Sequence, residues 1–148
     1  MAGQHCSGRV AALDLGKVRV GLAISDELGL FAHPRPALDG RHRPALLAAL
    51  ALLAAEEGVA TFLVGLPLDL SGRQGPAARR AARFAADLAA ATGLCVRLVD
   101  ERLTTVQATR ELRAAGASRR RIGQRVDGAA AALILQQWLD GQGGTGAG

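Results

Sequence analysis

The chain has 148 residues, 49% of them hydrophobic and 21% charged, which excludes a disordered protein and indicates one globular domain. Its net charge of +5 is carried by arginine, since Lys17 is the only lysine, and this excess suits either a phosphate-rich partner or a source biased toward arginine. Two cysteines, far apart and without metal-ligand spacing, argue against a disulfide framework and a zinc site. The lack of a long apolar run argues against a membrane span, and the few aromatic residues argue against a base-stacking platform.

The first predicted element is a β-hairpin over residues 10–25, with two apolar strands joined by a turn at residues 16–17. A two-residue turn places Asp14 opposite Arg19. Because side chains alternate between the faces of a strand, Asp14 shares its face with small residues: Ala12, Gly21 and Ala23. Asp14 therefore either forms a cross-strand ion pair with Arg19 or lies on a face that another group approaches closely.

Strands and helices alternate along the rest of the chain. A third strand is expected to begin at 29–32, and the prolines that follow are typical of an edge strand. Two further strands are predicted from short apolar runs at 60–65 and 94–99. Four helices are predicted from apolar spacing, capping residues, proline starts and glycine stops: 44–57, 76–92, 104–115 and 126–140.

This order of elements predicts the domain organisation. A leading hairpin followed by β-α-β units gives one mixed α/β sheet with helices on both faces. We expect residues 1–8 to be a flexible N-terminus, residues 9–140 to form a single domain, and residues 141–148 to be a disordered glycine-rich tail. The first residues lack a signal-peptide pattern, so a cytoplasmic location is expected.

Three acidic residues are candidates for chemistry. Asp14 lies in the first strand, Glu101 follows the last strand, and Asp127 lies at the start of the last helix. Glu101 could equally be a solvated loop carboxylate, and Asp127 could equally be an acid favoured by the helix dipole. If the three converged, they would repel one another unless a cation held them, and carboxylates suit Mg²⁺ or Mn²⁺. Such a cluster on a basic protein is typical of two-metal phosphodiester hydrolysis, although spacing alone does not show that these acids meet.

Four blocks of the sequence, in order, are LDLGKVRVGLAISD (13–26), VGLPL (64–68), VDERLTT (99–105) and VDGAAA (126–131). Together they resemble the YqgF/RuvX family, whose members are described as Holliday junction resolvases and as nucleases that mature the precursor of small-subunit ribosomal RNA. The resemblance implies an RNase H-like fold with strand order 3-2-1-4-5. It also implies a metal-dependent nuclease using Mg²⁺ or Mn²⁺, with these catalytic and metal-binding residues: Asp14, Glu101 and Asp127.

Basic residues with few compensating acids indicate contact with phosphate, although a solvated helix face would also carry arginine. The predicted nucleic-acid-binding residues are Lys17, Arg19, Arg73, Arg102, Arg119, Arg120, Arg121 and Arg125. The glycine-rich loop 65–75 either offers backbone N–H groups to a phosphate or is an ordinary strand-to-helix connection.

The leading functional hypothesis is a metal-dependent nuclease that cuts structured nucleic acid, predicted to process the 5′ end of pre-16S rRNA. One alternative is a Holliday junction resolvase, which would usually be a two-fold dimer. Another is a non-catalytic RNA-binding module in ribosome assembly or transcription, and a third is an ATPase-like or sugar-kinase-like domain. The predicted partner is nucleic acid, with no membrane, and the chain is expected to be a monomer or weak homodimer.

Overall fold

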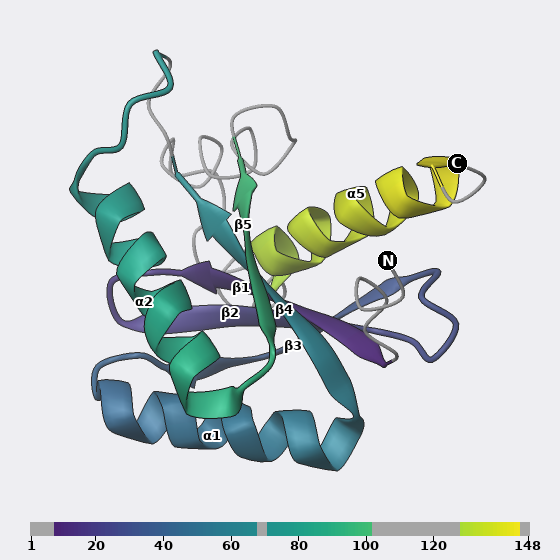
Figure 1. Ribbon diagram of the computed structural model, residues 1–148, viewed down its shortest axis with the longest axis horizontal. Helices are drawn as coiled ribbons and strands as arrows, with labels where there is room; N and C mark the ends of the chain where they lie inside the picture. Colours follow the sequence, from purple (N-terminus) through teal and green to yellow (C-terminus); the bar gives the residue numbers. More distant parts are fainter. Residues whose placement is uncertain (1–7, 68–70, 102–127, 146–148) are drawn as a thin grey trace, which may run out of the picture.

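The computed structural model describes residues 8–67, 71–101 and 128–145, which form one sheet with helices on both sides (Figure 1). The sheet has the order β3-β2-β1-β4-β5, as predicted. β1 pairs antiparallel with β2, and β2 pairs antiparallel with β3, whereas β1, β4 and β5 are parallel. The strands are β1 (Arg9–Leu15), β2 (Arg19–Ser25), β3 (Ala32–Asp39), β4 (Val59–Leu66) and β5 (Cys95–Asp100).

Helices α1 (Arg43–Glu57) and α2 (Pro76–Thr92) cover one face of the sheet, and α5 (Ala129–Thr145) covers the other (Figure 1). Phe62 and Phe84 are buried in the core beneath α1 and α2. A second core lies beneath α5. The central strands β1 and β4 are apolar on both sides because each side packs against helices.

The ends of α1 and α2 follow the sequence signals. Pro44 and Pro76 stand in the first turns, where the missing N–H of proline costs no hydrogen bond. Gly58 and Gly93 end the helices with positive φ angles of 70° and 71°. Glycine adopts this left-handed backbone without the steric cost that other residues meet, so the predicted stops are confirmed.

The last helix extends further than expected. The sequence predicts that it ends at Asp140, whereas α5 continues to Thr145. Glycine weakens a helix by about 1 kcal/mol relative to alanine but still donates its backbone hydrogen bond, so the glycines after Asp140 do not end the helix. The predicted helix at 104–115 lies outside the described residues. No helix in the described ranges is both long and apolar enough to cross a membrane.

The β1–β2 hairpin has a different register from the predicted one. Asp14 pairs with Gly21 and Leu15 with Val20, so the turn is centred on residues 17–18, one residue later than predicted. The N–H of Gly16 donates to the carbonyl of Arg19 at 2.9 Å and closes this turn. The prediction that Asp14 lies opposite Arg19 is therefore wrong. Because the register moves by two residues and side chains alternate with the same period, the strand residues keep their predicted faces.

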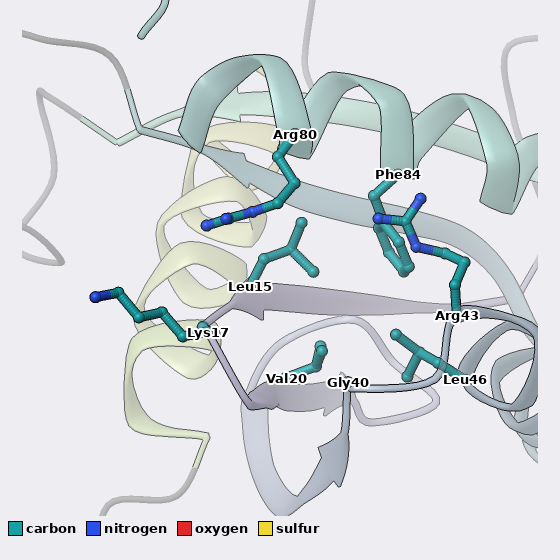
Figure 2. A pocket seen from close by; sticks show the side chains of 9 residues that line it. Leu15, Lys17, Val20, Gly40, Arg43, Leu46, Arg80 and Phe84 are labelled. Atoms are coloured by element: carbon teal, nitrogen blue, oxygen red, sulfur yellow. The ribbon is translucent and has the colours of Figure 1, made fainter. Parts of the chain in front are cut away.

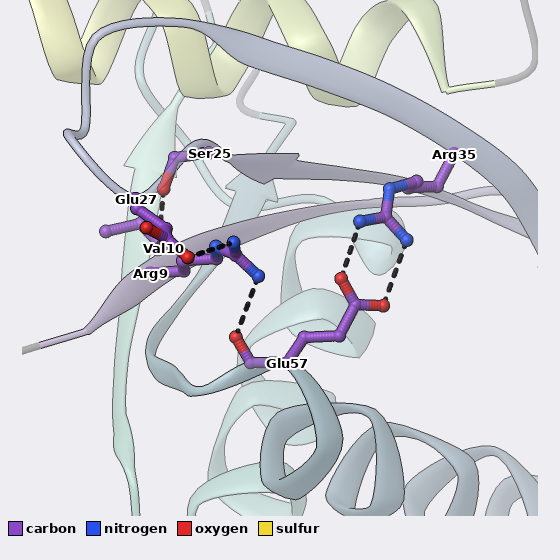
Figure 3. Close-up of polar contacts among 6 residues, drawn as sticks. All are labelled: Arg9, Val10, Ser25, Glu27, Arg35 and Glu57. Carbon is purple, nitrogen blue, oxygen red and sulfur yellow. Dashed lines mark hydrogen bonds and ion pairs between the residues drawn. The ribbon is translucent and has the colours of Figure 1, made fainter.

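β3 is an edge strand with prolines at two positions, as predicted, and two contacts hold it in place. The guanidinium of Arg35 in β3 forms two hydrogen bonds with the carboxylate of Glu57 at the end of α1 (Figure 3). Glu57 is also held by β1, because Arg9 donates to its backbone carbonyl at 3.2 Å. On the other side, Gln136 of α5 donates to one backbone carbonyl just before the strand and accepts from the N–H of Ala32, both at 2.9 Å.

Candidate active site

Asp14 lies near the carboxyl end of β1, on the face covered by α5. Its neighbour across the hairpin is Gly21, and a Cβ at that glycine would lie 3.5 Å from the Cβ of Asp14 and 3.7 Å from the Cα of Gly128. The Oδ1 atom of Asp14 is buried. The small-residue face predicted around Asp14 is thus confirmed, and the backbone just before α5 approaches Gly21 closely.

Glu101 is the first residue after β5 and is only 3% exposed. Its N–H donates to the carbonyl of Leu66 at 3.3 Å. Its carboxylate packs directly over Gly65, because a Cβ there would overlap Oε1 of Glu101 and would lie 2.9 Å from Cδ1 of Ile134. This burial between β4 and α5 rules out the solvated loop carboxylate that the sequence left open.

The sheet register brings Asp14 and Glu101 together. Leu13 of β1 pairs with Val64 of β4, so one residue further along each strand Asp14 is level with Gly65. Neighbouring strands are spaced about 4.8 Å apart. Since the Glu101 carboxylate lies over Gly65 on the α5 side, the two carboxylates are neighbours on one face, at the carboxyl end of the parallel strands.

Burial changes the proton affinity of Glu101. Loss of solvation, with a smaller contribution from the negative charge of Asp100, raises the pKa of Glu101 from 4.5 to about 7. Near neutral pH the carboxyl group is therefore partly protonated. A cation held beside it would favour the charged form and displace the proton.

The donor set fits a hard divalent cation. Carboxylate oxygens are the ligands that Mg²⁺ and Mn²⁺ prefer, and the two glycines leave space around both acids. The described ranges contain no cluster of three His, Cys, Asp or Glu residues able to hold a metal ion. The third predicted acid, Asp127, precedes Gly128 in the sequence and lies outside the described residues, so its place in the site stays a prediction.

The predicted nucleic-acid-binding residues fall into two groups. Lys17 and Arg19 are exposed in the turn and at the start of β2, and Arg73 is exposed after β4, where its Nε donates to Oγ of Ser71 at 3.1 Å. Positions 68–70 of the loop that carries Arg73 lie outside the described residues, so its contact with phosphate stays a prediction. The same holds for the remaining basic residues: Arg102, Arg119, Arg120, Arg121 and Arg125.

Two glycines that shape the site were not predicted to do so. Gly65 was predicted to end a strand and begin a loop, yet it also leaves the space that the Glu101 carboxylate fills. Gly128 has a φ of +80°, and a Cβ there would lie 2.6 Å from the carbonyl oxygen of Leu22. A glycine close in sequence to a candidate acid is the signal that could have identified Gly128, whereas nothing local marks Gly65.

Comparison with known proteins gives consistent results. The model of the RuvX family, described as Holliday junction resolvase, matches residues 8–141. A protein of Anaeromyxobacter sp. (strain Fw109-5) named "Putative pre-16S rRNA nuclease" is 48% identical over 134 residues, which cover 90% of this chain and 98% of that protein. A protein of the same name from Moorella thermoacetica is 44% identical over 138 residues, covering 93% and 99%.

Solved structures share the fold at low sequence identity. Thermus thermophilus RuvC in complex with a Holliday junction substrate aligns with a TM-score of 0.55 and 15% identity, over 93% of this chain and 97% of that one. The fowlpox virus Holliday junction resolvase aligns with a TM-score of 0.50 and 10% identity, over 90% and 99%. These likenesses confirm the predicted RNase H-like fold class.

Proposed function

The chain belongs to the RuvX family of Holliday junction resolvases, and on this premise we propose that it is a metal-dependent nuclease that hydrolyses phosphodiester bonds in structured nucleic acid. One observation carries the proposal. The carboxylate of Glu101 is buried over Gly65, beside Asp14, where its charge lacks solvation. Such a carboxylate destabilises the fold near neutral pH, and a bound cation would balance its poorly solvated charge.

The residues of the chain would share the work in a defined way. Asp14 and Glu101, together with Asp127, would hold Mg²⁺ or Mn²⁺. When bound, such ions activate a water molecule and stabilise the leaving oxygen of a phosphodiester. Asp14 is fixed by the central strand β1, and Glu101 is fixed by packing under α5. As a metal ligand Glu101 would be deprotonated, its proton passing to solvent, and its burial limits the access of bulk water to the carboxylate.

We propose precursor 16S rRNA as the substrate, because the relatives at 44–48% identity are named pre-16S rRNA nucleases. A cut at the 5′ end of this RNA is part of the proposal. A four-way DNA junction is the second candidate, because the family model is described as a Holliday junction resolvase. A pure RNA-binding module is disfavoured, since two buried or half-buried acids would repel phosphates and serve no purpose in binding them.

The test compares the wild-type protein with Asp14→Asn. Each is incubated with Mg²⁺ or Mn²⁺ and with three substrates: an RNA spanning the 5′ end of pre-16S rRNA, an unstructured single-stranded RNA, and a four-way DNA junction. Removing a carboxylate ligand should lower cleavage at least about 100-fold, since even outer-shell changes cost 10–100-fold. Binding measured without metal should survive, because the fold and the basic residues remain.

The control is Glu56→Gln, which removes one negative charge from an exposed position on α1. It should cut at the wild-type rate. Cleavage of the RNA alone supports rRNA processing, whereas paired cuts in the DNA junction support the resolvase. Equal products from the wild-type and Asp14→Asn proteins, or no cleavage of any substrate, would refute the nuclease proposal.

A further inference from the structure

A pocket lies on the opposite face of the sheet from the two acids (Figure 2). It is a pocket of about 90 Å³ between β1, β2, α1 and α2. Leu15 lines it, whereas the preceding residue, Asp14, belongs to the acidic face. Because consecutive side chains of a strand point to opposite faces, the end of β1 contributes to both sites.

The pocket has an apolar floor and a fixed backbone wall. Val20, Leu46 and Phe84 form the buried floor. The N–H of Gly40 donates to the carbonyl of Val18 at 2.7 Å, which ties the β1–β2 turn to the loop after β3. A Cβ at Gly40 would lie 2.9 Å from Cγ2 of Val20, so the two segments are in close contact. The turn that carries Lys17 is therefore held in place.

Three cationic side chains line the pocket, and none of its lining residues is acidic. Arg43 is already balanced, because its Nη1 lies 2.7 Å from Oδ2 of Asp87 and its guanidinium stacks over Phe84 at 5.2 Å from the ring centroid. Lys17 and Arg80 are exposed, and neither forms an ion pair within the described residues. Figure 2 shows both side chains extending to the same side of the pocket.

The pocket combines three cationic side chains with no acidic lining residue. Arg43, the first residue of α1, is held by Asp87, whereas Lys17 and Arg80 are not ion-paired within the described residues. Cationic side chains gathered in this way favour an anionic ligand such as phosphate.

We propose that the pocket formed by Lys17, Arg43 and Arg80 binds a backbone phosphate of the nucleic acid. The inference rests on the proposed function, because it extends the substrate path of the same protein. The pocket includes Lys17 of the β1–β2 turn and Leu15, the residue that follows Asp14, so it lies at the same end of β1 as the acids but on the opposite face of the sheet. An anchored phosphate there fixes the nucleic-acid strand without reading its bases, as backbone contacts do.

The experiment measures binding in EDTA, so that its result does not depend on cleavage. Fluorescence anisotropy with a labelled single-stranded RNA and a labelled four-way DNA junction gives the affinity at several salt concentrations. The variants are Lys17→Ala, Arg80→Ala and the double variant, and Arg80→Lys tests rescue by charge. Arg83→Ala is the matched control, since Arg83 is exposed on the same helix and does not line the pocket.

Each lost phosphate contact should flatten the slope of log affinity against log salt by about 0.7 for the single strand and about 0.9 for the duplex arms. Arg80→Lys should keep the wild-type slope, and Arg83→Ala should leave it unchanged. If the salt slopes of Lys17→Ala and Arg80→Ala both equal the slope of Arg83→Ala, the inference is overturned. Absence of nucleic-acid binding in the wild-type protein also overturns it.

Titration with inorganic phosphate tests whether the pocket binds a free phosphate ion instead of a phosphate of the nucleic-acid backbone. Phosphate binding that needs Lys17 and Arg80, with unchanged salt slopes for nucleic acid, identifies a site for a free anion and refutes the inference. Failure of the proposed function looks different. In that case the wild-type protein with metal cuts nothing, while the salt slopes in EDTA still change in the alanine variants.

Discussion

The burial of Glu101 makes a strong prediction for the substitution Glu101→Gln in the metal-free protein. In the folded state the pKa of this carboxyl is raised from 4.5 to about 7, so the folded protein holds the proton more tightly than the unfolded chain does. The resulting contribution to stability is complete below about pH 4.5 and is lost as the pH rises through about 7. The shift corresponds to roughly 3 kcal/mol, since each unit is about 1.4 kcal/mol.

Glutamine is neutral at every pH, so the variant does not suffer this loss. We expect the two proteins to differ little in free energy of unfolding below about pH 4.5, and the variant to be more stable by up to roughly 3 kcal/mol near pH 8. Urea unfolding in EDTA, followed by circular dichroism across this range, measures the difference. Glu56→Gln, at an exposed position on α1, serves as the matched control.

A divalent cation supplies the second arm of the test. Saturating Mg²⁺ should stabilise the wild-type protein near neutral pH, because a ligand that binds only the folded state raises the free energy of unfolding. It should stabilise Glu101→Gln much less. A difference between wild type and variant that stays constant from about pH 4.5 to about pH 8 would refute the reasoning from burial.

Two glycine substitutions test the backbone that shapes the site. Gly65→Ala should displace the Glu101 carboxylate and cost about 1–3 kcal/mol of stability by overpacking, which urea unfolding measures. The displaced carboxylate should lower the cleavage rate about 10–100-fold. An unchanged cleavage rate would contradict this prediction. Gly128→Ala should cost about 1–3 kcal/mol, because φ is positive and the new Cβ would lie 2.6 Å from the Leu22 carbonyl oxygen. Gly58→Ala is the comparison, since Gly58 also has a positive φ but has open space around the added Cβ. Thermal unfolding should show a smaller loss of stability for Gly58→Ala than for Gly128→Ala, and equal losses contradict the contact with the Leu22 carbonyl.

Local signals account for most of the fold. Pro76 and Gly93 mark the two ends of α2 because proline suits a first turn and glycine suits a left-handed stop. The face on which Asp14 lies was also predicted correctly, although the register was not. Moving the turn from residues 16–17 to residues 17–18 shifts the register by two residues, which leaves the same side chains on the same side of the sheet.

Two predictions from the sequence were wrong: the end of the last helix and the position of the β1–β2 turn. The glycines after Asp140 were taken as a stop for the last helix, yet α5 continues to Thr145. The turn was placed at residues 16–17, yet the hydrogen bond from Gly16 to Arg19 encloses residues 17–18. In both places the backbone hydrogen bonds decided the outcome, and residue type alone does not reveal them.

The sequence by itself determined the strands and helices that the structure describes, the mixed sheet and the family, because periodicity, capping residues and four ordered motifs are local properties of the chain. Only the tertiary structure decided that Glu101 is buried rather than solvated, and that its carboxylate lies over Gly65 beside Asp14. The physical reason is that burial and proton affinity depend on what packs against a side chain. For Glu101 that is β4 and α5, elements more than 25 residues away in the chain on either side.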